Sequence, residues 1–349
     1  MASEMSEKSA TSVHGALLSK PQRWWQFIVL LICLMVLMQG FSVIQQAFTF
    51  VYRFFLLREN DLPRRYGSGS WAVITGASSG QGQQLAYQFA ARGFHLLLIG
   101  SRRTHHTANA IRQRYKGVHV QILIKDFGRA FEADFFDDIA AEIERRDVSV
   151  MINNVGHRTG WNPYHKQPEH VIRDTIACGT IVQSRLSQIA ITRFLRRKLE
   201  HPSLHCALVF ITAQCLHSNF GFGVALSNEI TVPYLAVYES SNAFGYYHAC
   251  SIYQEYAGQF DILNVTPGAV ITENTQHLRD TMFAVPVEQF AHNIMQMLGN
   301  VQGTTCAHWG HALSTAAIAL FPWMKERALR RVGHTIADEY MRYGYKKGY

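Results

Sequence analysis

A glycine-rich turn near residue 76 is the part of the sequence best suited to bind a phosphate group. A strand-like apolar run ends at Thr75, and a helical pattern opens at Gln81. Glycines let the backbone approach a pyrophosphate closely, and the free N–H groups of a helix N-terminus favour its negative charge. The sequence therefore predicts a dinucleotide phosphate site here, formed by Thr75, Gly76, Ser78, Ser79, Gly80 and Gly82.

The end of the next apolar run indicates which dinucleotide would bind. The chain there reads Gly100-Ser101-Arg102-Arg103, with no carboxylate to accept the ribose 2′-hydroxyl of NAD. An arginine at this place suits the 2′-phosphate of NADP. We expect Ser101 and Arg102 to hold that phosphate, whereas Arg103 is either a further ligand or a solvated surface charge.

The elements that must position these residues alternate along the chain. Short aliphatic runs give way repeatedly to longer helical patterns, which is typical of a doubly wound parallel α/β sheet of the Rossmann type. The predicted strands are Trp71–Thr75, His95–Ile99, His119–Ile124, Val148–Asn153, Cys206–Thr212 and Asp261–Val265. The predicted helices include Gln81–Arg92, Phe131–Glu144, one ending near Leu199, and Tyr238–Tyr256. One dinucleotide-binding domain over residues 66–300 accounts for this pattern.

The spacing T-G-x-x-x-G-x-G resembles that of the short-chain dehydrogenase/reductase family. Further motifs follow in the family's order: Asp126 after the third strand, Asn153-Asn154-Val155-Gly156 after the fourth, and Pro267-Gly268 with Thr272 after the sixth. The resemblance implies that Asp126 contacts adenine and that Asn153, Asn154 and Gly156 form an adenosine-side element. It also implies that Pro267, Gly268 and Thr272 form the loop at the nicotinamide, and that the cofactor is NADP(H).

Within the family, one branch is most similar. The start at Trp71, an apolar N-terminal segment and Gly310-His311-Ala312-Leu313 resemble the microsomal very-long-chain 3-oxoacyl-CoA reductases and 17β-hydroxysteroid dehydrogenases. The resemblance implies a lipid-like ketone or alcohol substrate, fatty acid elongation or related lipid metabolism, and a lipid-synthesis enzyme complex as partner.

The catalytic positions are unusual for this family. Ketone reduction needs a hydride and a proton from a positioned acid. The resemblance assigns that acid to Tyr238, a lysine to position 242, a serine to 213 and an asparagine to 179. The chain instead has Asn242, Ala213 and Gly179. Asn242 retains the ability to bind a ribose hydroxyl but has no charge to lower the tyrosine pKa.

Two hypotheses follow from these replacements. The chain is either an oxidoreductase that uses Tyr238 with unconventional helpers, or an inactive NADP(H)-binding pseudoenzyme that scaffolds or regulates lipid synthesis. Residues 214–237 are longer than the family's equivalent and contain His217, Ser218, Ser227 and Glu229. This insertion either supplies a replacement group or is a polar surface loop.

The N-terminal part predicts a membrane anchor. No charged residue occurs from Trp24 to Tyr52, so residues 24–52 can form a transmembrane helix after a polar leader of residues 1–23. More arginines follow the segment than precede it, which places the main domain in the cytosol. Lys346 and Lys347 resemble an endoplasmic-reticulum retrieval signal in the membrane-proximal tail, residues 301–349. Residues 312–324 either dip into the membrane surface or pack in the core.

Charge and cysteine usage argue against other classes of function. The net charge is +8, but residues 1–65 carry +3 and residues 325–349 carry +4, so a basic nucleic-acid groove in the domain is not expected. The six cysteines include no C-x-x-C pair, and no carboxylate or thiolate completes a metal set around His308 and His311. We expect no metal, and we expect both histidines to lie in the core or at an interface.

Overall fold

The computed structural model describes residues 20–156, 162–213, 233–275 and 282–320, together with residues 330, 331, 333, 334 and 338. The described residues fall into two compact units, with helix α1 up to Phe50 in one and the residues from Val51 onward in the other. Some predictions concern residues outside these ranges: the leader up to residue 19, most of the insertion with His217, Ser218, Ser227 and Glu229, and the lysine pair at 346 and 347.

Seven parallel strands form the central sheet, in the order β3-β2-β1-β4-β5-β6-β9. The strands are β1 (Trp71–Thr75), β2 (His95–Gly100), β3 (Val120–Ile124), β4 (Val148–Asn153), β5 (Ala207–Ile211), β6 (Asp261–Val265) and β9 (Gly303–Thr305). The predicted doubly wound parallel sheet is therefore confirmed. The sequence did not predict β9, because its three residues, Gly-Thr-Thr, have no apolar signal and are recognised as a strand only by pairing with β6.

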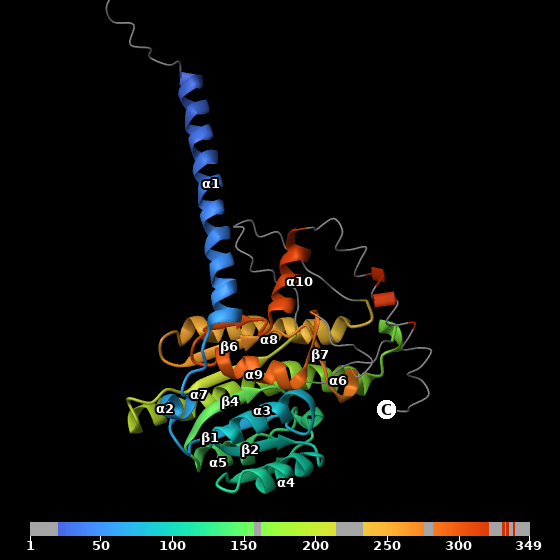
Figure 1. Ribbon diagram of the computed structural model, residues 1–349. Helices are drawn as coiled ribbons and strands as arrows, with labels where there is room; N and C mark the ends of the chain where they lie inside the picture. The colour runs from blue at the N-terminus through green and yellow to red at the C-terminus, as the bar shows by residue number, and fades with distance from the viewer. Residues whose placement is uncertain are drawn as a thin grey trace, which may run out of the picture. The chain divides into compact units, whose positions relative to one another are not determined.

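Helices cover both faces of the sheet (Figure 1). Helices α3 (Gly80–Ala91), α4 (Thr104–Arg114) and α9 (Val287–Met297) pack on one face, and α5 (Asp137–Glu144), α7 (Gln183–Glu200) and α8 (Ala236–Glu255) pack on the other. Along β1, Ala72 and Ile74 belong to the hydrophobic core on the side of α3, α4 and α9. Val73 belongs to the core on the side of α5, α7 and α8. This alternation follows from the two-residue repeat of a strand, and burial on both faces explains the nearly continuous apolar runs.

The remaining elements complete this domain. They are α2 (Leu62–Tyr66), η2 (Phe127–Arg129), η3 (Tyr164–Lys166), α6 (Glu169–Ile176), the π-helix η4 (Ala177–Val182), η5 (Glu273–Thr275) and α10 (Trp309–Leu320). A second, two-stranded sheet pairs β7 (Ala269–Ile271) with β8 (Ala284–Pro286). Helix α5 begins at Asp137 rather than at the predicted Phe131, since turns occupy the residues before it.

Helix α1 (Lys20–Val51) continues into a short π-helix, η1 (Tyr52–Leu56). Among the described residues, Trp24–Leu56 is the one helical segment long and apolar enough to cross a membrane, judged by length and composition. Large apolar side chains such as Leu37 and Phe41, each 71% exposed, lie along its surface. The segment overlaps the predicted anchor of residues 24–52.

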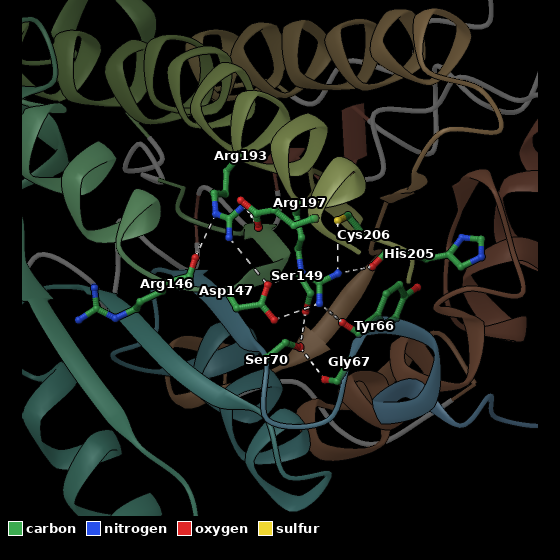
Figure 2. Close-up of polar contacts among 11 residues, drawn as sticks. Tyr66, Gly67, Ser70, Arg146, Asp147, Ser149, Arg193, Arg197, His205 and Cys206 are labelled. Carbon is green, nitrogen blue, oxygen red and sulfur yellow. Dashed lines mark hydrogen bonds and ion pairs between the residues drawn. The ribbon is translucent and has the colours of Figure 1, made fainter. Parts of the chain in front are cut away.

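The amino ends of the strands are joined by a network of polar contacts around Arg197 of α7, whose side chain is fully buried (Figure 2). Its guanidinium donates to both carboxylate oxygens of Asp147, at 2.5 and 3.2 Å, and to the carbonyl oxygens of Tyr66 and His205, at 2.6 and 3.1 Å. Nearby, the hydroxyls of Ser70 and Ser149 lie 2.7 Å apart. The contacts tie helix α7 to the starts of β1, β4 and β5.

The segment between η1 and β1 is fixed to the same end of the sheet. Arg65 binds Asp261 at the start of β6 through two nitrogens, at 2.6 and 2.8 Å, and the Tyr66 hydroxyl donates to the same carboxylate at 2.7 Å. Farther back in the segment, Glu59 forms an ion pair with Arg92 at the end of α3. These contacts hold the linker against the domain over most of its length.

Candidate functional site

The glycine-rich turn between β1 and α3 lies at the carboxyl ends of the strands. Gly76 and Gly80 have φ angles of +66° and +56°, a left-handed backbone that other residues rarely adopt. A Cβ atom at Gly82 would overlap the carbonyl oxygen of Gly76. Ser79 precedes the first turn of α3 without a side-chain capping bond. The turn therefore leaves a bare backbone and a helix N-terminus exposed to a ligand.

Thr75 and Asn154 bind each other and shape this turn. The Thr75 hydroxyl accepts the backbone N–H groups of Asn154 and Val155, at 2.9 and 3.1 Å, and donates to the carbonyl oxygen of Ile152. The Asn154 amide in turn donates to the carbonyl oxygen of Thr75 at 2.9 Å. Both residues were predicted to touch the cofactor; in the structure they lock the end of β1 to the end of β4. Gly156 follows directly and is exposed.

The residues after β2 and β3 lie at the adenosine end of the expected site. Ser101, Arg102 and Arg103 are all exposed, and Arg103 forms an ion pair with Glu273 at 2.7 Å. The backbone carbonyl oxygen of Arg102 accepts the N–H of His105 at 3.2 Å, but no side-chain hydrogen bond or ion pair joins Arg102 to another described residue. Asp126 accepts the backbone N–H of Gly128 at 3.1 Å, as the N-cap of η2.

The loop from Pro267 to Thr272 runs along the same edge. A Cβ atom at Gly80 would lie 3.5 Å from the Thr272 side chain, so the loop borders the glycine-rich turn. The hydroxyls of Thr272 and Thr275 lie 3.1 Å apart, and Thr275 also donates to the carbonyl oxygen of Val270. At the other end of the loop, Gly268 is bound by His311, a residue that the sequence indicated only as a core or interfacial histidine. The structure confirms that His311 is buried, with 1% of its surface exposed.

Tyr238 and Asn242 lie one helical turn apart on α8. Both are half-buried, and the Asn242 side-chain amide donates to the backbone carbonyl oxygen of Tyr238 at 2.9 Å. The amide is thus engaged within its own helix. Ala213 follows β5, and its neighbour Thr212 is buried and donates to the Asn264 side chain at 3.1 Å. The Thr212 hydroxyl therefore serves the β5–β6 contact rather than replacing the missing serine.

Gly179 lies in the π-helix η4, directly against α8. A Cβ atom there would lie 2.5 Å from the Cβ of Ser241. Tight packing between the two helices therefore excludes an asparagine side chain at this position.

The comparisons with known proteins agree with this geometry. A sequence profile described as short chain dehydrogenase matches residues 70–199. The very-long-chain 3-oxoacyl-CoA reductase of Emericella nidulans is 26% identical over 83% of this chain and 81% of its own. Human 17-beta-hydroxysteroid dehydrogenase type 3 is 26% identical over 75% of this chain and 79% of its own.

Over residues 70–199 the chain is similar to the short-chain dehydrogenases.

Solved structures show the same fold. A short-chain dehydrogenase from Sphingobium yanoikuyae in complex with NADPH covers 72% of this chain and 95% of its own, with 21% identity and a TM-score of 0.55. A 7beta-hydroxysteroid dehydrogenase covers 81% of this chain and 98% of its own, with 19% identity and a TM-score of 0.59. These likenesses establish the fold of this chain.

A buried glutamine behind the candidate site has no counterpart in the sequence predictions. Gln183 begins α7, four residues after Gly179, and is 3% exposed. Its amide fills the space that Gly245 of α8 leaves, where a Cβ atom would lie 2.6 Å from the glutamine oxygen. Within the described part of the chain, that oxygen and the Asn153 side-chain oxygen are buried without a hydrogen-bond partner. The sequence gives no sign that Gln183 is buried, because a glutamine is ordinary at the start of a helix. Its burial becomes visible only through its packing against Gly245.

Proposed function

We propose that this chain is an NADP(H)-dependent oxidoreductase that interconverts a lipid-like ketone and alcohol at the endoplasmic-reticulum membrane. The observation that carries the proposal is the bare backbone of the glycine-rich turn. An added Cβ at Gly76 would meet Asn154, and one at Gly82 would overlap the turn itself, so both positions require glycine for the turn to keep its tight backbone. A pyrophosphate fits such a place, beside the N-terminus of α3.

Arg102 supports NADP(H) rather than NAD(H) as the cofactor. Arg103 is engaged with Glu273, whereas Arg102 is exposed and forms no ion pair with a described residue. A guanidinium binds a phosphate through several charge-assisted hydrogen bonds. Arg102 is therefore the residue that we assign to the 2′-phosphate, with Ser101 beside it. NADPH, when bound, supplies a hydride to the carbonyl carbon of the substrate.

The substrate class and the membrane rest on the relatives and on α1. Both curated relatives reported above have names that denote enzymes of lipid-like ketones or alcohols. Such substrates partition into bilayers, and an apolar helix before the domain would keep the enzyme where they accumulate. Exposed Phe283 and Leu313, beside and on α10, add apolar surface to the domain. A neighbouring enzyme of lipid synthesis is the partner that this placement favours.

The proton source in this proposal is Tyr238. No lysine stands at position 242 to lower its pKa, and no serine stands at 213 to polarise the carbonyl. Turnover is therefore expected to be slow compared with an enzyme that has all four groups. The alternative of an inactive cofactor-binding protein gains no support from the two curated relatives, since both are named as enzymes.

The cofactor assignment is tested by paired arginine variants of the full chain in detergent. We expect Arg102→Ala to weaken NADPH binding about 10- to 100-fold, as lost charge-assisted hydrogen bonds cost about 1.5–3 kcal/mol, and to leave NADH binding unchanged. Arg103→Ala is the matched control and should change NADPH affinity less. Equal effects of both variants, or none, in a fluorescence titration would contradict the assignment of Arg102.

The reaction is tested with a long-chain 3-oxoacyl-CoA and with a steroid ketone. NADPH oxidation should occur in the wild type and be lost in Tyr238→Phe, while NADPH affinity remains the same. If the wild type binds NADPH but oxidises it with neither substrate, the proposed activity fails and only the cofactor site stands. If Tyr238→Phe is as active as the wild type, another residue donates the proton.

A further inference from the structure

His311 binds the loop after β6 through both of its ring nitrogens. The backbone N–H of Gly268 donates to Nδ1 at 3.2 Å, and Nε2 lies 3.1 Å from the carbonyl oxygen of Ala269. Since Nδ1 accepts a hydrogen bond, the ring hydrogen is on Nε2, which donates to Ala269. Burial lowers the pKa of His311, which favours this neutral form. The ring thus grips two consecutive residues of the loop, one by its donor and one by its acceptor.

The same histidine also contacts residues outside the loop. It belongs to α10, and the backbones of Cys306 and Phe283 also lie within hydrogen-bonding reach of the ring. Its ring centroid lies 5.0 Å from that of His308 and 6.0 Å from that of Phe290. An apolar side chain would fill this space equally well but would leave the Gly268 N–H and the Ala269 carbonyl without their partner. Leaving such partly buried backbone groups unpaired is costly, and the two nitrogens of the imidazole avoid that cost.

The gripped residues lie at one end of the candidate cofactor site. Gly268 and Ala269 follow β6, whose partner β5 leads to Ala213, while the far end of the loop reaches Gly80 and Arg103. In a doubly wound sheet, a dinucleotide extends across the carboxyl edge, with its adenosine half over the first strands and its other half toward β5 and β6. The histidine therefore holds the part of the loop that borders the nicotinamide half.

We propose that His311 is a positioning residue for the nicotinamide half of the cofactor. It acts through the backbones of Gly268 and Ala269, and in this way it fixes the position of that loop relative to α10. The inference rests on the proposed function, because it requires NADP(H) in the site. It assigns a role in the site to a histidine that lies 42 residues after Ala269 in the sequence.

A comparison of two ligands on the full chain in detergent tests this role. NADPH contains the nicotinamide half, whereas 2′-phospho-ADP-ribose lacks the nicotinamide ring and keeps the rest. We expect His311→Leu to weaken NADPH binding about tenfold, the equivalent of one or two hydrogen bonds, and to change 2′-phospho-ADP-ribose binding less than twofold. His311→Gln, which retains a donor and an acceptor, should restore part of the NADPH affinity. His308→Leu is the matched control: the Nδ1 of His308 accepts the backbone N–H of Gly310, and the variant should bind both ligands normally.

Three results would overturn the inference, and they are distinct from a failure of the proposed function. Equal weakening of both ligands by His311→Leu would indicate a purely structural histidine. Unchanged NADPH binding in both His311→Leu and His311→Gln would show that the loop does not depend on the ring. If His311→Leu does not fold, His311→Gln decides. In that case the third contradicting result is a His311→Gln variant that binds NADPH normally or that loses affinity for both ligands equally. A wild type that binds neither ligand would instead refute the cofactor site itself.

Discussion

The two edges of the central sheet differ in how their polar groups are used. At the amino edge, Arg197 makes bonds to Asp147, Tyr66 and His205, and Asp261 is bound by Arg65 and Tyr66. At the carboxyl edge, the three positions to which the resemblance assigns catalytic groups hold Ala213, Asn242 and Gly179. The difference teaches that the polar groups of the amino edge are bound to one another and support the fold, whereas the fold does not depend on charged or hydroxyl groups at positions 179, 213 and 242.

The largest expected effect in this comparison is a loss of stability at the amino edge. Arg197→Met removes a fully buried cation and leaves the Tyr66 and His205 carbonyl oxygens without their donor. Breaking a buried ion pair costs about 3–5 kcal/mol, and because Asp147 is 41% exposed we expect a loss of about 3 kcal/mol. Urea unfolding of the domain, followed by tryptophan fluorescence, measures it.

Arg196 provides the matched control for this measurement. It is the preceding residue of α7 and pairs with Glu144, but both side chains are more than half exposed. Arg196→Met should change the free energy of unfolding by less than about 0.5 kcal/mol. Equal losses in the two variants would show that the amino-edge network is not what stabilises the fold.

The next effect is a gain of activity at the carboxyl edge. Asn242→Lys with Ala213→Ser restores a cation near Tyr238 and a hydroxyl after β5, and we expect the rate of NADPH oxidation to rise about 100-fold. Gly179 is left unchanged, as its Cβ would lie 2.5 Å from that of Ser241. The assay is NADPH oxidation with a long-chain 3-oxoacyl-CoA, and a rate no higher than that of the wild type would contradict the assignment of these vacant positions.

The smallest effect is a dependence of stability on acid at the amino edge. Burial alone would raise the pKa of Asp261, but hydrogen bonds from Arg65 and Tyr66 hold it below its ordinary value. The ionised form therefore contributes stability above the ordinary carboxyl pKa, and this contribution is lost as the pH falls through the lower, folded-state value. Between pH 5 and pH 2, about the range where carboxylates titrate, the wild type should lose more stability than Asp261→Asn. Parallel curves for the two proteins would show that this carboxylate is not responsible.

The sequence predicts much of this molecule because its main signals are local. Strands β1 and β4 have the predicted bounds, and the glycine-rich turn, read from spacing alone, lies between a strand and a helix as expected. The helix predicted from Phe131 begins instead at Asp137, because the residues before Asp137 form turns.

The features that the sequence does not predict depend on contacts between distant residues. Arg197 looks like any basic residue on an amphipathic helix until the fold brings it to Tyr66, which is 131 residues away. The role of His311 becomes visible only through its contact with Gly268, and that of Gln183 only through its packing against Gly245. Likewise, Ser241 on another helix is what leaves no room for a side chain at Gly179. No local periodicity records such pairings.

The pairing of Arg65 with Asp261 also sets an order of events during synthesis. The two residues are 196 positions apart, so the linker emerges from the ribosome long before its partner exists. At about 5–20 residues per second, the interval is roughly 10–40 s. During that time the side chains of Arg65 and Tyr66 lack the carboxylate that binds them in the folded protein. The linker can be bound at the start of β6 only after residue 261 has been made, and a chain that stalls before it is left with that contact unformed.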